Sequence, residues 1–341
     1  MGVLHYFRLA FLYTGIALLL EGWLGWIYTR TLVGLGHFIF ICFILILLEI
    51  SLSFDNSIIN ARVLCNMTQQ WQKRFFTWGM IVAVFGVRMI FPLVIVTIAA
   101  HINPVSAFQL AIWQPEEYTA IIMDAHVGIA AFGGTFLMMM GLKYFFNPEK
   151  DVHWIHCLET RAKRCGSMRG IEIAITLLLI LIFSSLIDDA DKHIFLLAAI
   201  YALLVFLLIE ASSTFCNITQ EQVYRSGIGA FISLEMLDAS FSFDGVIGAF
   251  ALSKNFLTIA IGLGVGALYV RSMTMMLVEN KILNRYRYLE HGAFYAILML
   301  AFSMYIQTLI HIPEVIIGLS SIYFIITAFY SSIRYKNRDL A

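Results

Sequence analysis

Acidic residues lie in the middle of two of the most apolar stretches of this sequence. One stretch contains Glu49-Ile-Ser-Leu-Ser-Phe-Asp55-Asn56, and the other contains Asp238-Ala-Ser-Phe-Ser-Phe-Asp244-Gly245. Carboxylate and amide oxygens bind hard or borderline divalent cations such as Mn²⁺, Mg²⁺ and Ca²⁺, whereas Cu(I) prefers thiolates. A carboxylate in apolar surroundings is costly unless a partner compensates its charge. The two segments therefore predict a binding site for a divalent cation.

The two acidic segments are copies of one pattern. Aligned without gaps, they share an acid at the first position and then Ser, Ser, Phe and Asp at the same offsets. The flanks repeat as well: each copy is followed by a Val-Arg pair and then by an acid close to a histidine. These flanking residues are Val87-Arg88, Val270-Arg271, Asp124-Ala-His126 and Glu290-His291. The sequence thus predicts two copies of a three-helix unit.

Helical periodicity determines which of these polar side chains share a face. Residues i, i+4, i+7 and i+11 lie on one face of a helix, which groups Glu49, Ser53, Asn56 and Asn60 in the first copy. The same rule groups Glu235, Asp238 and Ser242 in the second copy. Asp55 and Asp244 lie about 120° away from their partner acids. A helix break near Asn56 and Gly245 would bring each pair together.

The predicted site has ligands, auxiliary residues and counter-ions. The candidate metal ligands are Glu49, Asp55, Asn56, Asp238 and Asp244, with Asp124 and Glu290 as further ligands or proton carriers. His126, His291, Asn60 and Glu235 are auxiliary candidates. Arg88 and Arg271 are expected to act as gating or counter-ion residues, because arginine does not bind metals. The alternative is a set of purely structural ion pairs, although two arginines cannot neutralise six acids.

The composition shows what surrounds these residues. Hydrophobic residues make up 60% of the 341, and charged residues only 13%. A soluble domain cannot bury that much apolar surface, so we expect a multi-spanning membrane protein that contacts the lipid bilayer. The 22 basic and 22 acidic residues cancel, which argues against nucleic acid as a partner. No HExxH, GxSxG or Walker motif occurs, so we do not expect an enzyme.

Apolar runs of about 20 residues predict an all-α membrane protein with about ten transmembrane helices in a single domain, 1–341. The runs lie near 6–28, 35–64, 77–100, 119–146, 171–187, 193–215, 227–253, 256–279, 288–310 and 314–333. The second and seventh are too long for straight spans and carry polar residues midway, so we expect them to be broken or strongly tilted.

The distribution of basic residues predicts the orientation. In the ten-span arrangement, Arg30, Lys192 and Lys254 are the loop cations on one side of the membrane, and all other loop lysines and arginines lie on the side of the termini. Positive loops remain in the cytoplasm, so both termini are expected there, in a bacterial inner membrane. The repeated units, within 35–146 and 227–310, begin five helices apart and are therefore inverted. Inverted repeats are typical of transporters with a midplane site.

The motifs resemble those of a known family. Besides the two acidic segments, Ser-Phe-Asp244-Gly-Val-Ile-Gly-Ala-Phe-Ala251, Tyr288-Leu-Glu-His-Gly-Ala293, Val-Arg88-Met-Ile-Phe-Pro92 and Ala-Phe-Gly-Gly-Thr-Phe136 are similar to TerC-like integral membrane proteins. The nearest subgroup is domain-of-unknown-function family 475, over about residues 35–310. The resemblance implies an inverted-repeat fold similar to LysE-type exporters and a link to manganese efflux and tellurite resistance. It also implies that Asp55, Asn56 and Asp244 form the acidic motif, with Arg88 and Arg271 as helix arginines.

The function expected from these observations is transport of a divalent metal ion, most plausibly export of Mn²⁺ in exchange for protons or another ion. The metal is a substrate, and no permanently bound cofactor is expected. One alternative is a membrane scaffold that recruits cytoplasmic stress-response or tellurite-resistance partners through the basic segment 147–170. Another is amino-acid export, for which Arg88 or Arg271 with an acid would supply a pocket.

Overall fold

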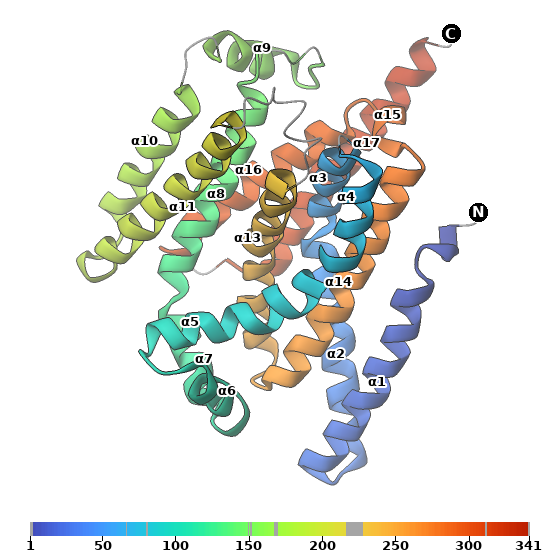
Figure 1. The fold of residues 1–341 in the computed structure, drawn as a ribbon, viewed down its shortest axis with the longest axis vertical. Helices are drawn as coiled ribbons and strands as arrows, with labels where there is room; N and C mark the ends of the chain where they lie inside the picture. Colours follow the sequence, from blue (N-terminus) through green and yellow to red (C-terminus); the bar gives the residue numbers. More distant parts are fainter. Residues whose placement is uncertain are drawn as a thin grey trace.

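The structure is a computed structural model that describes residues 3–339 except 66, 80, 149, 151, 167–169, 216–227 and 311. Throughout this part of the chain the regular structure is helical, and it contains no strand. The helices form an elongated bundle (Figure 1). This agrees with the all-α class predicted from the apolar runs.

The helices follow the apolar runs of the sequence, with short helices at the ends of the bundle. Their bounds are η1 (Val3–His5), α1 (Arg8–Thr29), α2 (Leu32–Leu52), α3 (Phe54–Cys65), α4 (Gln69–Arg74), η2 (Phe75–Gly79), η3 (Val82–Ile90), α5 (Phe91–Ala99), α6 (Pro104–Trp113), α7 (Pro115–Asp124), α8 (His126–Phe145), α9 (His156–Cys165), α10 (Ile171–Leu186), α11 (Asp189–Phe215), α13 (Ile228–Leu252), α14 (Phe256–Glu279), α15 (Ile282–Arg285), α16 (Leu289–Gln307) and α17 (Glu314–Asp339). Segments η2 and η3 are π-helical.

Seven helices in the described residues are long and apolar enough to cross a membrane. They are α1, α2, α8, α11, α14, α16 and α17. Large apolar side chains such as Leu19, Leu181, Leu208 and Tyr323 are exposed on the outside of the bundle, where lipid would cover them. The chain is thus organised as a multi-pass membrane protein. The segments Gly86–Ile98, Pro104–Trp113 and Ile171–Leu186 are apolar but shorter, and a count of ten spans remains a prediction.

The second apolar run breaks as predicted, whereas the seventh does not. Helix α2 ends at Leu52 and α3 begins at Phe54, with Ser53 outside helical geometry between them. In contrast, α13 continues through Gly245 without interruption, which leaves the tilted alternative for the seventh run. Gly245 instead packs where a Cβ atom would lie 3.2 Å from the Glu49 carboxylate. Its role is to permit close approach between two helices.

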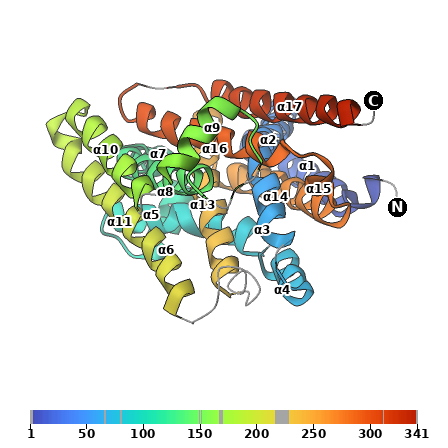
Figure 2. The same ribbon diagram turned by 90° about the horizontal axis from the view of Figure 1, so that it is seen from above.

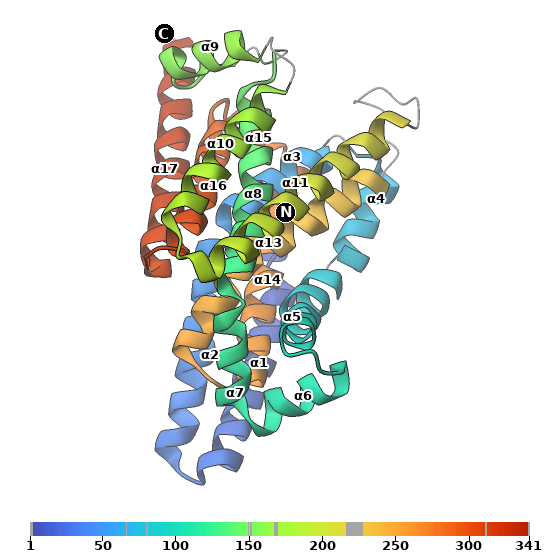
Figure 3. The ribbon, with the colours of Figure 1, turned by 90° about the vertical axis from the view of Figure 1, so that its left-hand side faces the viewer.

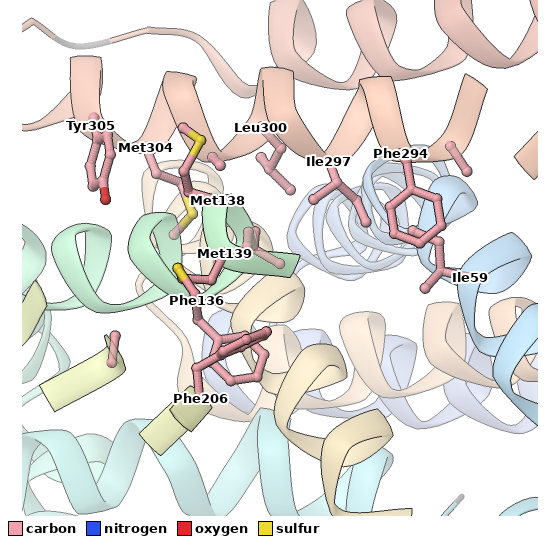
Figure 4. Close-up of a cluster of buried hydrophobic side chains, with 14 of the residues drawn as sticks. Ile59, Phe136, Met138, Met139, Phe206, Phe294, Ile297, Leu300, Met304 and Tyr305 are labelled. Carbon is pink, nitrogen blue, oxygen red and sulfur yellow. The ribbon is translucent and has the colours of Figure 1, made fainter. Parts of the chain in front are cut away.

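Helix α8 lies at the centre of the larger half of the bundle. It packs against α11 and α16 (Figure 1). Met138 and Met139 of α8 lie close to Leu300 and Met304 of α16 in the main apolar cluster (Figure 4). At one edge of this cluster the hydroxyl groups of Thr135 and Tyr305 share a buried hydrogen bond of 2.7 Å. Dispersion contacts of this kind hold membrane helices together, because lipid is as apolar as their side chains.

Helices α1, α2 and α14 lie side by side in the other part of the bundle (Figure 1). Gly262 and Gly266 of α14 face α2, and Cβ atoms there would lie 2.7 Å from Leu45 Cβ and 2.5 Å from Glu49 Cβ. Two successive glycines on one face therefore allow the two backbones to approach closely, as small residues do in membrane proteins. This seam brings Glu49 against α14.

The two ends of the bundle differ in structure. Helix α9 lies across the end toward which the C-terminus also points (Figures 1 and 2). The short helices α5, α6 and α7 gather toward the opposite end, near the lower part of the view in Figure 3. The turn between α1 and α2 and the turn between α13 and α14 also lie toward that opposite end (Figure 1). We refer to it below as the distal end.

Candidate functional site

Arg88 of η3 is at the centre of a buried charge network. Its side chain is 1% exposed and forms an ion pair with the equally buried Glu49 of α2. Its Nη1 atom also lies 3.8 Å from Oδ2 of Asp238 on α13. The Ser53 hydroxyl donates a 2.8 Å hydrogen bond to Glu49 Oε1. Three helices far apart in sequence thus meet at one guanidinium group.

Arg271 of α14 extends the network from the other side. Its Nη2 atom donates to Glu235 Oε1 at 3.1 Å and to the carbonyl of Gly79 at 3.0 Å. The same atom lies 3.9 Å from Asp238 Oδ2, so Asp238 lies between two arginines. The guanidinium carbon of Arg271 is 3.7 Å from the ring centroid of Phe75, a cation–π contact. The expectation that both arginines act as counter-ions is consistent with this arrangement.

Asn56 links α3 to the same carboxylate. Its Nδ2 atom donates a 2.5 Å hydrogen bond to Asp238 Oδ1, although the two residues are far apart in sequence. Asn56 lies near the start of α3, just after the interruption at Ser53. The network therefore joins residues that the sequence places in different copies of the repeat.

The network has more acidic than basic groups, and several of its oxygens are not hydrogen-bonded. Three carboxyl groups, those of Glu49, Glu235 and Asp238, face two guanidinium groups. Within the described residues, buried atoms without a hydrogen bond include Glu49 Oε2, Asp238 Oδ2, Glu235 Oε2 and Asn56 Oδ1. Buried polar atoms in native proteins are normally satisfied, and exceptions often mark a binding site. These four atoms are acceptor oxygens, and the Nη1 atom of Arg271, a donor, is also buried without a hydrogen bond among the same residues.

Asp55 is buried but faces another part of the bundle. It is 0% exposed, and its Oδ1 accepts the backbone N–H of Asn56 at 2.9 Å. Its neighbour on the other side is Ser321 of α17. The break in the second run therefore does not bring Asp55 to Glu49, which faces Arg88. The two acids serve different contacts, as expected for side chains about 120° apart on a helix.

The other predicted ligands lie at helix ends or outside the described side chains. Asp124 is exposed as the last residue of α7, and the partly buried His126 begins α8. Glu290, at the start of α16, forms a 3.1 Å ion pair with Arg62 of α3. Asn60 is buried in α3. The side chain of Asp244 lies outside the residues that the structure describes.

No group of three or more His, Cys, Asp or Glu side chains is positioned to hold a metal ion in the part of the chain that the structure describes. The arginines separate the network acids from one another, so the carboxylates contact guanidinium groups in this conformation. Glu235, an auxiliary candidate in the sequence, is a full member of the network. The set of metal ligands predicted from the sequence thus stays a prediction. Of its members, Glu49, Asn56 and Asp238 belong to one network, in which Asn56 contacts Asp238 and both acids contact Arg88.

His291 belongs to a separate polar cluster under α9. Its Nε2 atom lies 2.8 Å from the carbonyl oxygen of Val152, and its Nδ1 atom lies 3.3 Å from the Tyr144 hydroxyl. Glu159 of α9 is only 1% exposed and accepts hydrogen bonds from Lys150 at 3.0 Å and from Tyr295 at 3.2 Å. His291 thus helps to hold the segment before α9.

Charges in this cluster change the acidity of its members outside the membrane spans. Burial lowers the pKa of Lys150, although Glu159 acts in the opposite direction. Burial would raise the pKa of Glu159, but the charges of His291 and Lys150 outweigh it and the pKa is lowered. The cluster is an ionic clamp between α9 and α16.

A family comparison adds to this description. The family model described as "Protein of unknown function (DUF475)" matches residues 54–339. The chain belongs to the DUF475 family. The match covers most of the chain, and it starts and ends later than the range of 35–310 expected from the motifs. In this DUF475 protein, Asn56, Arg88, Asp238 and Arg271 lie within the matched range, and Glu49 precedes it.

The wider comparisons returned no relatives. No curated protein matches this DUF475 chain significantly. No solved structure matches it significantly either. The function of this DUF475 protein must therefore be argued from its own site.

Sequence reasoning missed one acidic residue that the structure places at a notable position. Glu21 of α1 is 0% exposed and accepts a 2.9 Å hydrogen bond from the Thr258 hydroxyl of α14. The signal was present in the sequence, because Glu21 is the single acid in the first apolar run. It has no counterpart in the repeat, so the repeat pattern did not point to it.

Proposed function

We propose that this protein transports a divalent cation across the membrane and that Glu49, Asn56 and Asp238 form the substrate site. One observation carries the proposal: a network of three carboxyl and two guanidinium groups, buried except for the partly buried Glu235, joins the two repeated segments in the interior of an apolar helical bundle. Ionisable groups at membrane depth are expensive and mark ion or substrate pathways. A purely structural role would be served by balanced pairs.

The chemistry of the free acceptors favours a hard cation. Glu49 Oε2, Asn56 Oδ1 and Asp238 Oδ2 belong to side chains that already contact one another or a shared arginine. Carboxylate and amide oxygens suit Mn²⁺, Mg²⁺ and Ca²⁺. The resemblance to TerC-like proteins makes Mn²⁺ the first ion to test.

In the proposed mechanism, Arg88 and the transported cation alternate as the positive partner of the site carboxylates. In this conformation Arg88 contacts both Glu49 and Asp238. A divalent cation that binds these carboxylates would displace Arg88, since both positive groups compete for the same oxygens. Return of Arg88 to the carboxylates would then release the cation. Protons that leave or join the carboxylates would couple the fluxes and drive export.

An inverted repeat would alternate access to this site. The helix contacts support it: α3 packs on α16 as α13 packs on α8, and α2 packs on α14 as α13 packs on η3. A two-fold rotation that exchanges segments 35–146 and 227–310 would turn the α3–α16 contact into the α13–α8 contact. It would likewise turn the α2–α14 contact into the α13–η3 contact. Rocking of one repeat against the other would expose the midplane site to each side in turn. The positions of the loop cations support cytoplasmic termini in a bacterial inner membrane.

Flux measurements on the purified protein in liposomes test the proposal. We expect Mn²⁺ flux to fall by about 10–100-fold or more in Glu49→Gln and in Asp238→Asn, because each change removes a charged ligand. Asp55→Asn and Asp244→Asn test the acidic motif in the same assay and are expected to lose flux. Glu117→Gln, at an exposed position, is the matched control and should transport normally.

The opposite result would overturn the proposal. Full activity of Glu49→Gln or of Asp238→Asn contradicts the assigned site, and full activity of Asp55→Asn contradicts a role for the acidic motif in transport. If the native protein moves no divalent ion under any imposed pH gradient, the scaffold interpretation is favoured. A stoichiometric partner that requires the basic segment 147–170 would then support that interpretation.

A further inference from the structure

Glu21 is a buried carboxyl group outside the network around Arg88. It lies on α1 with no exposed surface, and Oε2 accepts the Thr258 hydroxyl at 2.9 Å. Its Oε1 atom is buried without a hydrogen bond among the described residues. No lysine, arginine or histidine in the described part of the chain forms an ion pair with it. Cys42 of α2 lies near enough for its thiol to interact electrostatically with Glu21.

A pocket lies on the other side of Thr258. It has a volume of about 240 Å³ and is lined by Thr258, His37, Ser253, Lys254 and Asn255, among others. Its lining residues Ser253, Lys254 and Asn255 form the turn between α13 and α14, and this turn lies toward the distal end of the bundle (Figure 1). His37 and Lys254 are exposed, so solvent reaches the pocket from that end. Thr258 therefore lines this pocket and also contacts the buried carboxyl group of Glu21, although Thr258 itself is only 1% exposed.

Glu21 and the Arg88 network contact helix α14 at two different levels along its length. Thr258, Gly262 and Gly266 follow one another at intervals of four on α14, and Gly266 packs against Glu49. Eight helical residues correspond to about 12 Å. The fully buried Leu45 and Cys42 lie between the two levels. Glu21 therefore contacts α14 at the level of the distal pocket, and the Arg88 network lies at a separate level further along α14.

We propose that Glu21 is a proton-exchange site open to the distal side of the membrane, with Thr258 as its relay. A carboxylate buried without a cation is costly, so such a group takes up a proton. In the relay, a hydronium ion in the pocket gives a proton to the Thr258 oxygen while the hydroxyl proton moves to Glu21 Oε2. The net change is transfer of one proton from water to the carboxylate. His37, Lys254 and the Cys42 thiol are the other titratable groups facing this path.

The role of this site in transport rests on the proposed function, because proton exchange at the distal side would supply the counter-ion for cation export. The site itself does not depend on transport. One experiment therefore tests whether Glu21 exchanges a proton, and a second tests whether this exchange drives transport.

Chemical labelling tests the site. Dicyclohexylcarbodiimide is an apolar reagent that adds the O–H of a carboxylic acid across one C=N bond, and the product rearranges to a stable N-acylurea. We expect the purified native protein to gain one reagent on the peptide that contains Glu21, with labelling that falls as the pH is raised. Glu21→Gln should lose this label, and Glu117→Gln should keep it. Thr258→Val should change the pH at which labelling is half lost, because the hydroxyl contacts Oε2.

Absence of the label on this peptide, or equal labelling at every pH, would overturn the proton-exchange site. Unfolding of Glu21→Gln would not obscure the result, because the native protein and Thr258→Val are labelled independently. A label on Glu21 in a protein that moves no cation would leave the site standing and overturn the proposed transport.

A flux comparison tests the use of the site. In liposomes, we expect Glu21→Gln to lose Mn²⁺ accumulation driven by a pH gradient and to retain exchange of external for internal Mn²⁺ at equal pH, since that exchange moves no net proton. Normal gradient-driven accumulation in Glu21→Gln would overturn the coupling role while the network site stands. Loss of both activities would assign Glu21 to substrate binding and contradict the inference.

Discussion

Removing one charged side chain from the buried network around Arg88 leaves its partner without an opposite charge. Arg88 contacts Glu49 and Asp238 at a position with almost no exposed surface. Breaking a buried ion pair leaves an uncompensated charge, which costs more than the pair itself contributes. Arg88 is therefore expected to serve both stability and transport, and the two roles separate only in double variants.

Arg88→Met tests this at the residue scale. We expect it to lower the free energy of unfolding by about 3–5 kcal/mol, because two buried carboxylates lose their cation. Arg88→Met with Glu49→Gln should recover part of that loss. Thermal unfolding in detergent measures both, with the exposed Arg285→Met as the control. Strictly additive losses would show that the two residues are not coupled.

At the scale of elements, the close seam between α2 and α14 positions the network. Gly266 lies where an added Cβ would come within 2.5 Å of Glu49 Cβ. A methyl group there forces α2 and α14 apart and moves Glu49 away from Arg88. The distance between two helices thus sets the geometry of an ion pair.

Gly266→Ala should therefore destabilise the protein by about 1–3 kcal/mol, the usual cost of overpacking, and reduce flux. The matched control is Gly15→Ala on α1, where an added Cβ meets nothing within 4 Å. That control should be neutral or stabilising, because alanine favours helix more than glycine does. Equal thermal stability of both variants would argue against the seam.

At the scale of the whole molecule, α9 ties a loop across one end of the bundle. Glu159 accepts from Lys150 and Tyr295 and lies 3.4 Å from His291 Nε2. Helix α9, which belongs to the basic segment 147–170, is thereby anchored on α16.

Glu159→Gln is expected to loosen this anchor and to speed hydrogen exchange in the amides of α9, while Glu172→Gln on α10 should not. The pKa of Glu159 is lowered in the folded protein, so its stabilising contribution is complete above its ordinary value of 4.5. That contribution is lost as the pH falls through the lowered pKa. Protection of α9 that stays constant from neutral to strongly acidic pH would contradict this role.

The sequence alone indicated the apolar, membrane-protein character, the helical class, an irregularity in the second apolar run and the presence of acids and arginines within apolar helices. These depend on local hydropathy and on helical periodicity, which neighbouring residues specify. Family membership also followed from local motifs. The sequence did not determine that α13 continues through Gly245. A glycine is compatible with either a kink or close packing, and the position of Glu49 beside Gly245 shows that this glycine packs closely.

Only the tertiary structure decided which charges meet. Asn56 and Asp238 are 182 residues apart, and their contact depends on how four helices pack. Periodicity places Glu49 and Asp55 about 120° apart on a helix, but only the packing decides that Glu49 faces Arg88 and Asp55 faces α17. Glu21 was an isolated acid until α14 placed Thr258 beside it. Pairing of buried charges is a long-range property, because a side chain meets its partner only after separate helices have been brought together.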